Sequence, residues 1–158
     1  MRITEPIRTE HKELIPEIDK LKQTAEAIGR VPSEQLAAQI DERLNFLHHH
    51  LLPHARQEEE ILYPAVARAM GSSDATRTMS RDHQAVKQLT QRLQELRNNF
   101  DDNQAREVLY GLYTLVSVHF AKEEEIYLTL LDERLSESEA AELFHQLEHA
   151  GHHSGHTH

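Results

Sequence analysis

The chain has 158 residues, a length that fits one domain with a substantial hydrophobic core. Its formal net charge of −10 argues against nucleic acids and anionic membrane surfaces as partners. It has no cysteine, which excludes disulfides, iron–sulfur clusters and thiol catalysis, and no apolar run typical of a membrane span or signal peptide, so a cytoplasmic protein is expected.

Apolar residues recur every three or four positions through most of the chain, which predicts amphipathic helices and no strands. Four long helices are expected, over about 4–29, 33–71, 74–100 and the segment that follows Asp101-Asp102-Asn103. The apolar face of the third is expected to end with Phe100, and that of the fourth to include Ile126 and Leu130. A capping box from Ser136 to Glu139 predicts a short fifth helix that ends near His149.

Long helices joined by short connections predict an all-α fold, an up-down-up-down four-helix bundle with a short C-terminal fifth helix. The bundle is expected to occupy residues 1–149, and the glycine- and histidine-rich residues 150–158 to form a disordered tail. Pro16 and Pro53 lie inside the first and second helices, where each removes a backbone donor and is expected to bend its helix. Such a bend is either absorbed by packing or spreads the helices around a site.

One pattern occurs twice along the chain: a lone histidine, then a histidine followed four residues later by a glutamate. On a helix this last spacing presents an imidazole and a carboxylate on one face, a turn apart. The residues are His11, His54 and Glu58 in the first copy, and His83, His119 and Glu123 in the second.

The predicted helix lengths bring both copies to one layer of the bundle. Burying four histidines and two carboxylates together is costly without a partner, and a metal ion is the simplest one. Two cations bridged by two carboxylates and capped by imidazoles match the dimetal sites that are built inside helix bundles. Such ligands suit iron, zinc or manganese without deciding among them.

Other polar residues accompany the pattern. His50, one turn before His54, is expected to share its face, and is either a further metal ligand or a histidine at the rim of the site. The remaining glutamates of the two motifs are expected on a solvated face, with Glu59 and Glu124 better placed than Glu60 and Glu125 to hydrogen-bond an imidazole ligand.

Two tyrosines, Tyr63 and Tyr127, lie four or five residues beyond the motif glutamates. A phenol near a metal can ligate it or be oxidised, but core packing is the expected role of both.

The motif order, the run Glu-Glu-Glu-Ile-Leu-Tyr-Pro that begins at Glu58 and the helix lengths resemble the hemerythrin-like (HHE cation-binding) domain family over residues 1–149. The resemblance implies two iron ions, a non-haem di-iron pair that an oxo group can bridge, with dioxygen, nitric oxide or peroxide as ligand. Family members also store iron, sense oxygen or iron, or help to repair iron–sulfur clusters. Transferred position by position, the metal ligands are His11, His54, Glu58, His83, His119 and Glu123, with both glutamates bridging.

Two departures argue against an oxygen carrier. Lys87 stands where oxygen-carrying members have a further histidine, and Glu123 replaces an aspartate at longer spacing. The leading expectation is a cytoplasmic di-iron protein that binds or reduces small oxidants. A redox-silent zinc protein is the alternative, and a sensor or interaction module is a third reading. No nucleic acid or membrane partner is expected, and a protein partner stays open.

Overall fold

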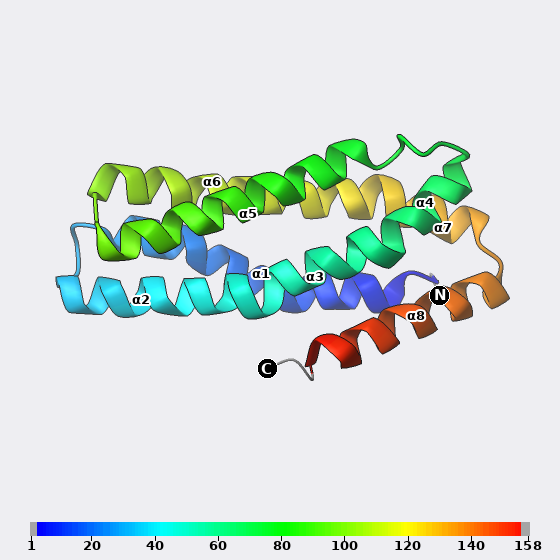
Figure 1. Ribbon diagram of the computed structural model, residues 1–158, viewed down its shortest axis with the longest axis horizontal. Coiled ribbons are helices and arrows are strands. Elements are labelled where there is room, and N and C mark those ends of the chain that lie inside the picture. The colour runs from blue at the N-terminus through cyan, green and yellow to red at the C-terminus, as the bar shows by residue number, and fades with distance from the viewer. Residues whose placement is uncertain (1–2, 156–158) are drawn as a thin grey trace.

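The computed structural model describes residues 3–155, with side chains as far as His149, and this part of the chain contains helices and no strand. Four long helical rods lie antiparallel, and a fifth helix turns back at one end and packs beside the second rod (Figure 1). The rods are α1 (Glu5–Ala27), α2 to α4 (within Ser33–Met70), α5 (Arg77–Asn98), and α6 to α7 (within Asp102–Arg134); the fifth helix is α8 (Glu137–Gly155). None of the described helices has the length and apolar character needed to cross a bilayer. The predicted all-α bundle is confirmed.

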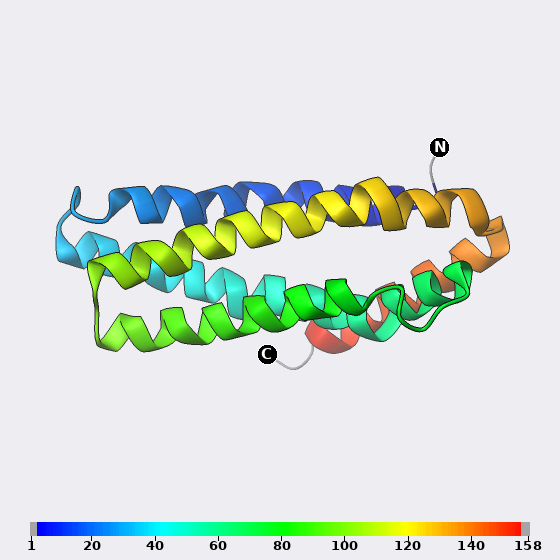
Figure 2. The ribbon, with the colours of Figure 1, turned by 90° about the horizontal axis from the view of Figure 1, so that it is seen from above.

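Each rod packs against two others. The first rod contacts α2 and α6, and α5 contacts the same two from the other side, so the four rods enclose one core. Viewed from above, α1 and α6 form one layer of the bundle, and α5 lies in the other layer with the α2–α3 rod (Figure 2).

Two of the rods contain π-helical turns. They are η1 (Leu47–Leu51) and η2 (Glu58–Leu62), on either side of α3 (Leu52–Gln57), and η3 (Glu123–Tyr127) between α6 (Asp102–Lys122) and α7 (Leu128–Arg134); η2 leads into α4 (Tyr63–Met70). A π-turn inserts one extra residue, which rotates the next part of the rod by about 100° relative to a continuous α-helix. The first of these turns ends just before Pro53, whose missing N–H cannot bond to the preceding turn.

The helix ends follow local chemistry. Gly71 closes α4 in the left-handed region at φ 69°. The Asp101 carboxylate accepts a hydrogen bond from the backbone N–H of Gln104 and so caps α6. The predicted capping box is present, since Ser136 and Glu139 each accept a hydrogen bond from the other's backbone N–H.

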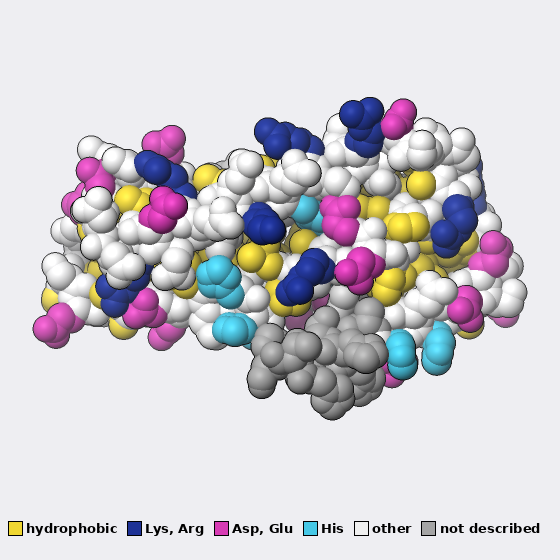
Figure 3. All heavy atoms as spheres, viewed as in Figure 1, with side chains coloured by type: hydrophobic (Ala, Val, Ile, Leu, Met, Phe, Trp, Pro, Cys, Tyr) yellow, Lys and Arg dark blue, Asp and Glu magenta, His cyan; other side chains and the backbone are white. Residues whose placement is uncertain are grey.

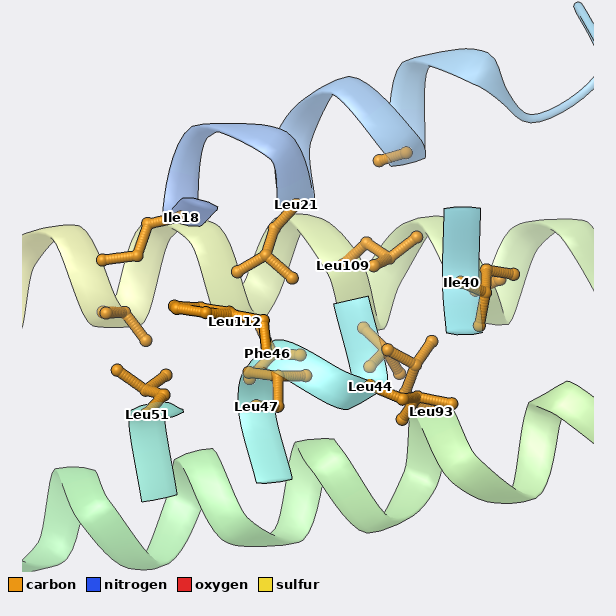
Figure 4. Packing of buried hydrophobic residues seen from close by; sticks show 14 of the residues in the cluster. Ile18, Leu21, Ile40, Leu44, Phe46, Leu47, Leu51, Leu93, Leu109 and Leu112 are labelled. Carbon is orange, nitrogen blue, oxygen red and sulfur yellow. The ribbon is translucent and has the colours of Figure 1, made fainter. Parts of the chain in front are cut away.

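The core consists of two apolar clusters. In the larger one, leucines and isoleucines from all four rods face one another, as Leu21, Leu47, Leu93 and Leu109 do in Figure 4. The smaller cluster lies toward α8 and contains Ile7, Leu62, Tyr63, Val66, Met79, Leu128, Leu131 and Leu143. On every rod the predicted metal ligands fall between residues of the two clusters, so polar side chains interrupt the apolar core at a single level.

Two predicted core positions are wrong. Phe100 is 40% exposed because α5 ends at Asn98 and leaves it in the connection to α6. Ile126 is 54% exposed because η3 shifts the phase of the rod by one residue, which turns Leu128 and Leu131 inward instead. Leu130 is partly buried against the smaller cluster.

The fifth helix is longer than predicted. Its backbone is helical to Gly155, beyond the expected end near His149. The side chains of residues 150–155 and all of residues 156–158 lie outside the described part of the chain, so the disordered His-rich tail stays a prediction.

Candidate metal centre

The six predicted ligands meet inside the bundle. His11 comes from α1, His54 from α3, Glu58 from η2, His83 from α5, His119 from α6 and Glu123 from η3. Their donor atoms form two groups, each able to hold one metal ion: His11 and His54 with both glutamates, and His83 and His119 with both glutamates. Each group therefore has two histidines of its own, and the two groups share Glu58 and Glu123.

The first group is fully enclosed, with His11 and Glu123 at 0% exposure. Nε2 of His11 lies 3.5 Å from Oε1 of Glu123, and Nε2 of His54 lies 3.5 Å from Oε2 of Glu58. None of these four atoms has a hydrogen-bond partner, and they make up four of the six such buried side-chain atoms in the described part of the chain. A buried polar atom without a partner is costly. A single cation would partner all four, so the residues fit a metal.

The second group uses the opposite carboxylate oxygens. Oε1 of Glu58 lies 3.1 Å from Nε2 of His83, and Oε2 of Glu123 lies 3.5 Å from Nε2 of His119. The two Nε2 atoms are 3.0 Å apart, a separation that requires a proton or a metal cation between two nitrogen lone pairs. Each glutamate thus offers one oxygen to either group.

Tyr63 lies in the second group, which corrects the expectation that it only packs in the core. Its hydroxyl donates to Oε2 of Glu123 at 2.8 Å and lies 3.0 Å from Nε2 of His119. Burial and the carboxylates of Glu58 and Glu123 raise the pKa of Tyr63 far above its ordinary value, so the phenol keeps its proton. Tyr127, in contrast, donates to the carbonyl of Ala75, away from the centre.

The two halves of the site are therefore unequal. Tyr63 stands five residues after Glu58, across the η2 turn, and the equivalent position after Glu123 is Leu128. The first group has no phenol, and the ring of Phe120 stacks on His11 there, with 4.2 Å between ring centroids.

Each of the four imidazoles is held by an outer carboxylate through Nδ1. The pairs and their distances are Glu10 to His54, 2.7 Å; Glu59 to His83, 2.8 Å; Asp82 to His119, 2.9 Å; and Glu124 to His11, 3.3 Å. In every pair the carboxylate comes from one rod and the histidine from the next, so the four hydrogen bonds close a ring around the bundle. A carboxylate at Nδ1 keeps the proton there and leaves the Nε2 lone pair facing the centre, where a metal would bind.

The remaining motif glutamates were expected on a solvated face, and Glu60 and Glu125 are exposed. Glu59 and Glu124, the better placed pair, instead each bond to an imidazole. The other two carboxylates, Glu10 and Asp82, were missed. Their signal is that each directly precedes a lone histidine, and neighbours on a helix point about 100° apart, so the acid faces the next rod while the histidine faces the core.

The π-turn that carries Glu123 is anchored by polar contacts. The carbonyl of Glu124, in η3, accepts hydrogen bonds from the Thr129 hydroxyl and from the Arg8 guanidinium. Arg8 is buried and is itself held by Asp132 at 3.3 Å. These contacts fix the wide turn, and with it the direction of Glu123.

His50 is not brought to the site. It is exposed and stacks on Phe46, with 6.2 Å between ring centroids, and it belongs to neither group. The expectation that it shares a face with His54 is wrong because His50 lies within η1, whose extra residue rotates it away.

Without metal, the site holds protons. Burial opposes a charge on His119, but Glu123, Glu58 and Asp82 outweigh it and raise its pKa to about 8. His54 behaves alike, because Glu58 and Glu10 raise its pKa well above its ordinary value in spite of burial. Burial and the charge of Glu58 raise the pKa of Glu123 to about 8. Two carboxylates this close do not ionise together without cations.

Comparison with known proteins gives one match. The family model described as the hemerythrin HHE cation binding domain matches residues 2–131, which include all six predicted ligands and end before α8. Comparison with curated proteins and with solved structures gives no match.

Proposed function

The chain belongs to the family of the hemerythrin HHE cation binding domain, and we propose that it holds two metal ions side by side. His11 and His54 would hold one metal, and His83 and His119 the other. Glu58 and Glu123 would bridge the pair. The observation that carries this proposal is that each glutamate offers one oxygen to each group.

The charge of the site supports a pair of cations. Two central and four outer carboxylates surround the four imidazoles, and of the outer four only Asp82 also pairs with a lysine, Lys122, at 2.7 Å. Glu58 and Glu123 are buried, and buried carboxylates require compensating charge. Two divalent ions supply four positive charges at the one level where the apolar core is interrupted.

We propose iron as the metal and dioxygen, nitric oxide or peroxide as the ligand. The donors are imidazole nitrogens and carboxylate oxygens with no thiolate, which suits redox-active iron. Bound iron would supply the electron transfer and the binding position for the small molecule. The protein's own part is to exclude bulk water with its two apolar clusters and to keep a proton on the Tyr63 hydroxyl beside Glu123.

Zinc is the second candidate. Each group presents two imidazoles and two carboxylate oxygens, and four such ligands satisfy zinc. At shared nitrogen and oxygen ligands the general order of affinities also favours zinc over ferrous iron. A zinc protein with these ligands would serve stability, metal handling or signalling without redox chemistry.

Metal analysis after expression with both iron and zinc available separates the two. The proposal predicts two iron ions per chain and an absorption spectrum that changes when the reduced protein is mixed with peroxide. Two zinc ions and no spectral change would support the zinc alternative, and fewer than two metal ions per chain would contradict the paired centre.

A further inference from the structure

A surface pocket of about 460 Å³ lies directly outside the second group. One wall comes from the rod that contains η1, α3 and η2, and the other wall comes from α5. Figure 3 looks onto this face, where lysine and arginine side chains flank a recess over α3 and α5.

The inner wall of the pocket is the imidazole of His83. This side chain is 11% exposed, and its Nε2 belongs to the second group. Glu59, which holds Nδ1 of the same ring, also lines the pocket. Only the thickness of one imidazole therefore separates the pocket from the candidate metal position. In the first group His11 is fully buried under Phe120 and His54 is 6% exposed, and neither lines this pocket.

The charges around the pocket are the reverse of those on the whole chain. Arg56 and Lys87 line it and are exposed, and neither forms an ion pair or hydrogen bond with any residue of the described part of the chain. The acid among the lining residues, Glu59, is engaged by His83 and by the Ser80 hydroxyl at 2.7 Å. Two cations against one carboxylate give this lining an excess of positive charge in a protein of net charge −10, which creates a local positive potential.

A second surface pocket, beside α1 and α2, has the opposite charge. Its lining has four acids, Glu13, Glu17, Asp41 and Glu42, against two bases, Lys20 and Arg43, and it contains no residue of either group.

We infer that the pocket lined by Arg56 and Lys87, here called the anion pocket, binds small monovalent inorganic anions and delivers them to the second metal. At about 460 Å³ the pocket has room for a small hydrated anion, and its charges rather than its volume select the ligand. Delivery to the metal rests on the proposed function; binding in the pocket does not. The positive charges concentrate anions by long-range attraction, which does not act on neutral dioxygen or nitric oxide.

Azide and nitric oxide, mixed with the metal-loaded protein, test the delivery step. The variant R56Q/K87Q should slow azide association by about tenfold at low ionic strength and lose this difference at high salt. Its rate with nitric oxide should not change. The matched control R30Q/K22Q removes the same charge from exposed side chains that do not line the pocket, and should leave both rates unchanged. Equal slowing of azide by both variants, or no slowing by R56Q/K87Q, would overturn delivery.

Bromide tests the pocket itself without a metal. Crystals of metal-free protein soaked in bromide should show anomalous density beside Arg56 and Lys87, and crystals of R56Q/K87Q should show none there. If crystals of the wild-type protein show no bromide density in this pocket, the proposal that it binds anions is overturned. Because this experiment needs no metal, it decides on the pocket even if the proposed function fails.

Discussion

Each buried imidazole is oriented by a carboxylate that belongs to the neighbouring rod. Glu10 is the simplest to test, because it is partly exposed and its carboxylate bonds to Nδ1 of His54. Replacing it with alanine should lower metal affinity by about ten- to a hundredfold, since the ring is no longer held with Nε2 toward the centre. Competition with a chelator of known affinity measures this. The control E13A removes the same charge from an exposed position of the same helix and should bind metal as the wild type does. Equal affinity of the two variants would contradict the orienting role.

Tyr63 distinguishes the second group from the first. In Tyr63→Phe the hydroxyl that contacts Glu123 and His119 is lost, while the ring still fills the core. We expect the second metal to bind more weakly and the first to bind as before, measured as two separate steps in a calorimetric titration. The metal-free variant should also lose about 1–3 kcal/mol of unfolding free energy, because the buried partners of this hydroxyl are left without their hydrogen bond.

Tyr127→Phe is the matched control, because its hydroxyl bonds to a backbone carbonyl away from the centre. It should leave both binding steps unchanged. If both steps weaken equally in Tyr63→Phe, the two groups are not distinguished by the phenol.

At this scale the sequence predicts which side chains meet better than it predicts what surrounds them. The repeated spacing of histidine and glutamate predicts that six side chains share the inner faces of their helices, and the structure brings all six together. The sequence could not predict that Tyr63 lies at the site, because α-helical spacing does not place a residue five positions after Glu58 on the same face. Only the extra residue of η2 does so.

At the scale of elements, the π-turns connect the fold to the site. Glu58 and Glu123 are the first residues of η2 and η3, so the wide turn lies between each glutamate and the apolar cluster below it. A rod without its extra residue could keep either the glutamate or the next leucines in place, but not both.

Deleting Ile126 tests this directly. The residue is 54% exposed and lies within η3, so its loss removes the extra residue and little packing. The deletion should keep the helical content but rotate Glu123 by about 100° relative to Leu128, with loss of at least one metal ion per chain. The control Ile126→Ala should bind two metal ions and change stability by less than about 0.5 kcal/mol. A deletion variant that keeps both ions would show that the π-turn is dispensable.

Element limits were predictable where their causes are local. Apolar periodicity and capping residues place the helix ends within a few residues of those observed, as at Gly71, Asp101 and Ser136. The π-turns were not predictable, because they continue a helix and leave only a shift of phase. The structure shows that shift, because Ile126 is exposed and Leu128 is buried in its place.

At the scale of the whole molecule, the centre is a charged layer between two apolar clusters, and its protons link stability to pH. His119 and Glu123, each with a pKa of about 8, hold protons that the unfolded chain releases above their ordinary values of 6.5 and 4.5. The folded metal-free protein therefore binds more protons than the unfolded chain at neutral pH. Its free energy of unfolding should fall as the pH rises through about 8.

Urea denaturation of the metal-free protein at about pH 6.5 and about pH 9 measures this difference. Metal ions displace the same protons, so metal affinity should rise over the interval in which metal-free stability falls. A metal-free protein that is more stable at the higher pH would contradict the assignment of these protons.

The most direct test of the paired centre is anomalous diffraction from crystals of the metal-loaded protein, collected at the absorption edges of iron and zinc. We predict two peaks inside the bundle, one within bonding distance of His11 and His54 and the other of His83 and His119, with a carboxylate oxygen of Glu58 and Glu123 on each. The absorption edge at which the peaks appear identifies the metal. A single peak, or two peaks that the glutamates do not bridge, would contradict the central claim.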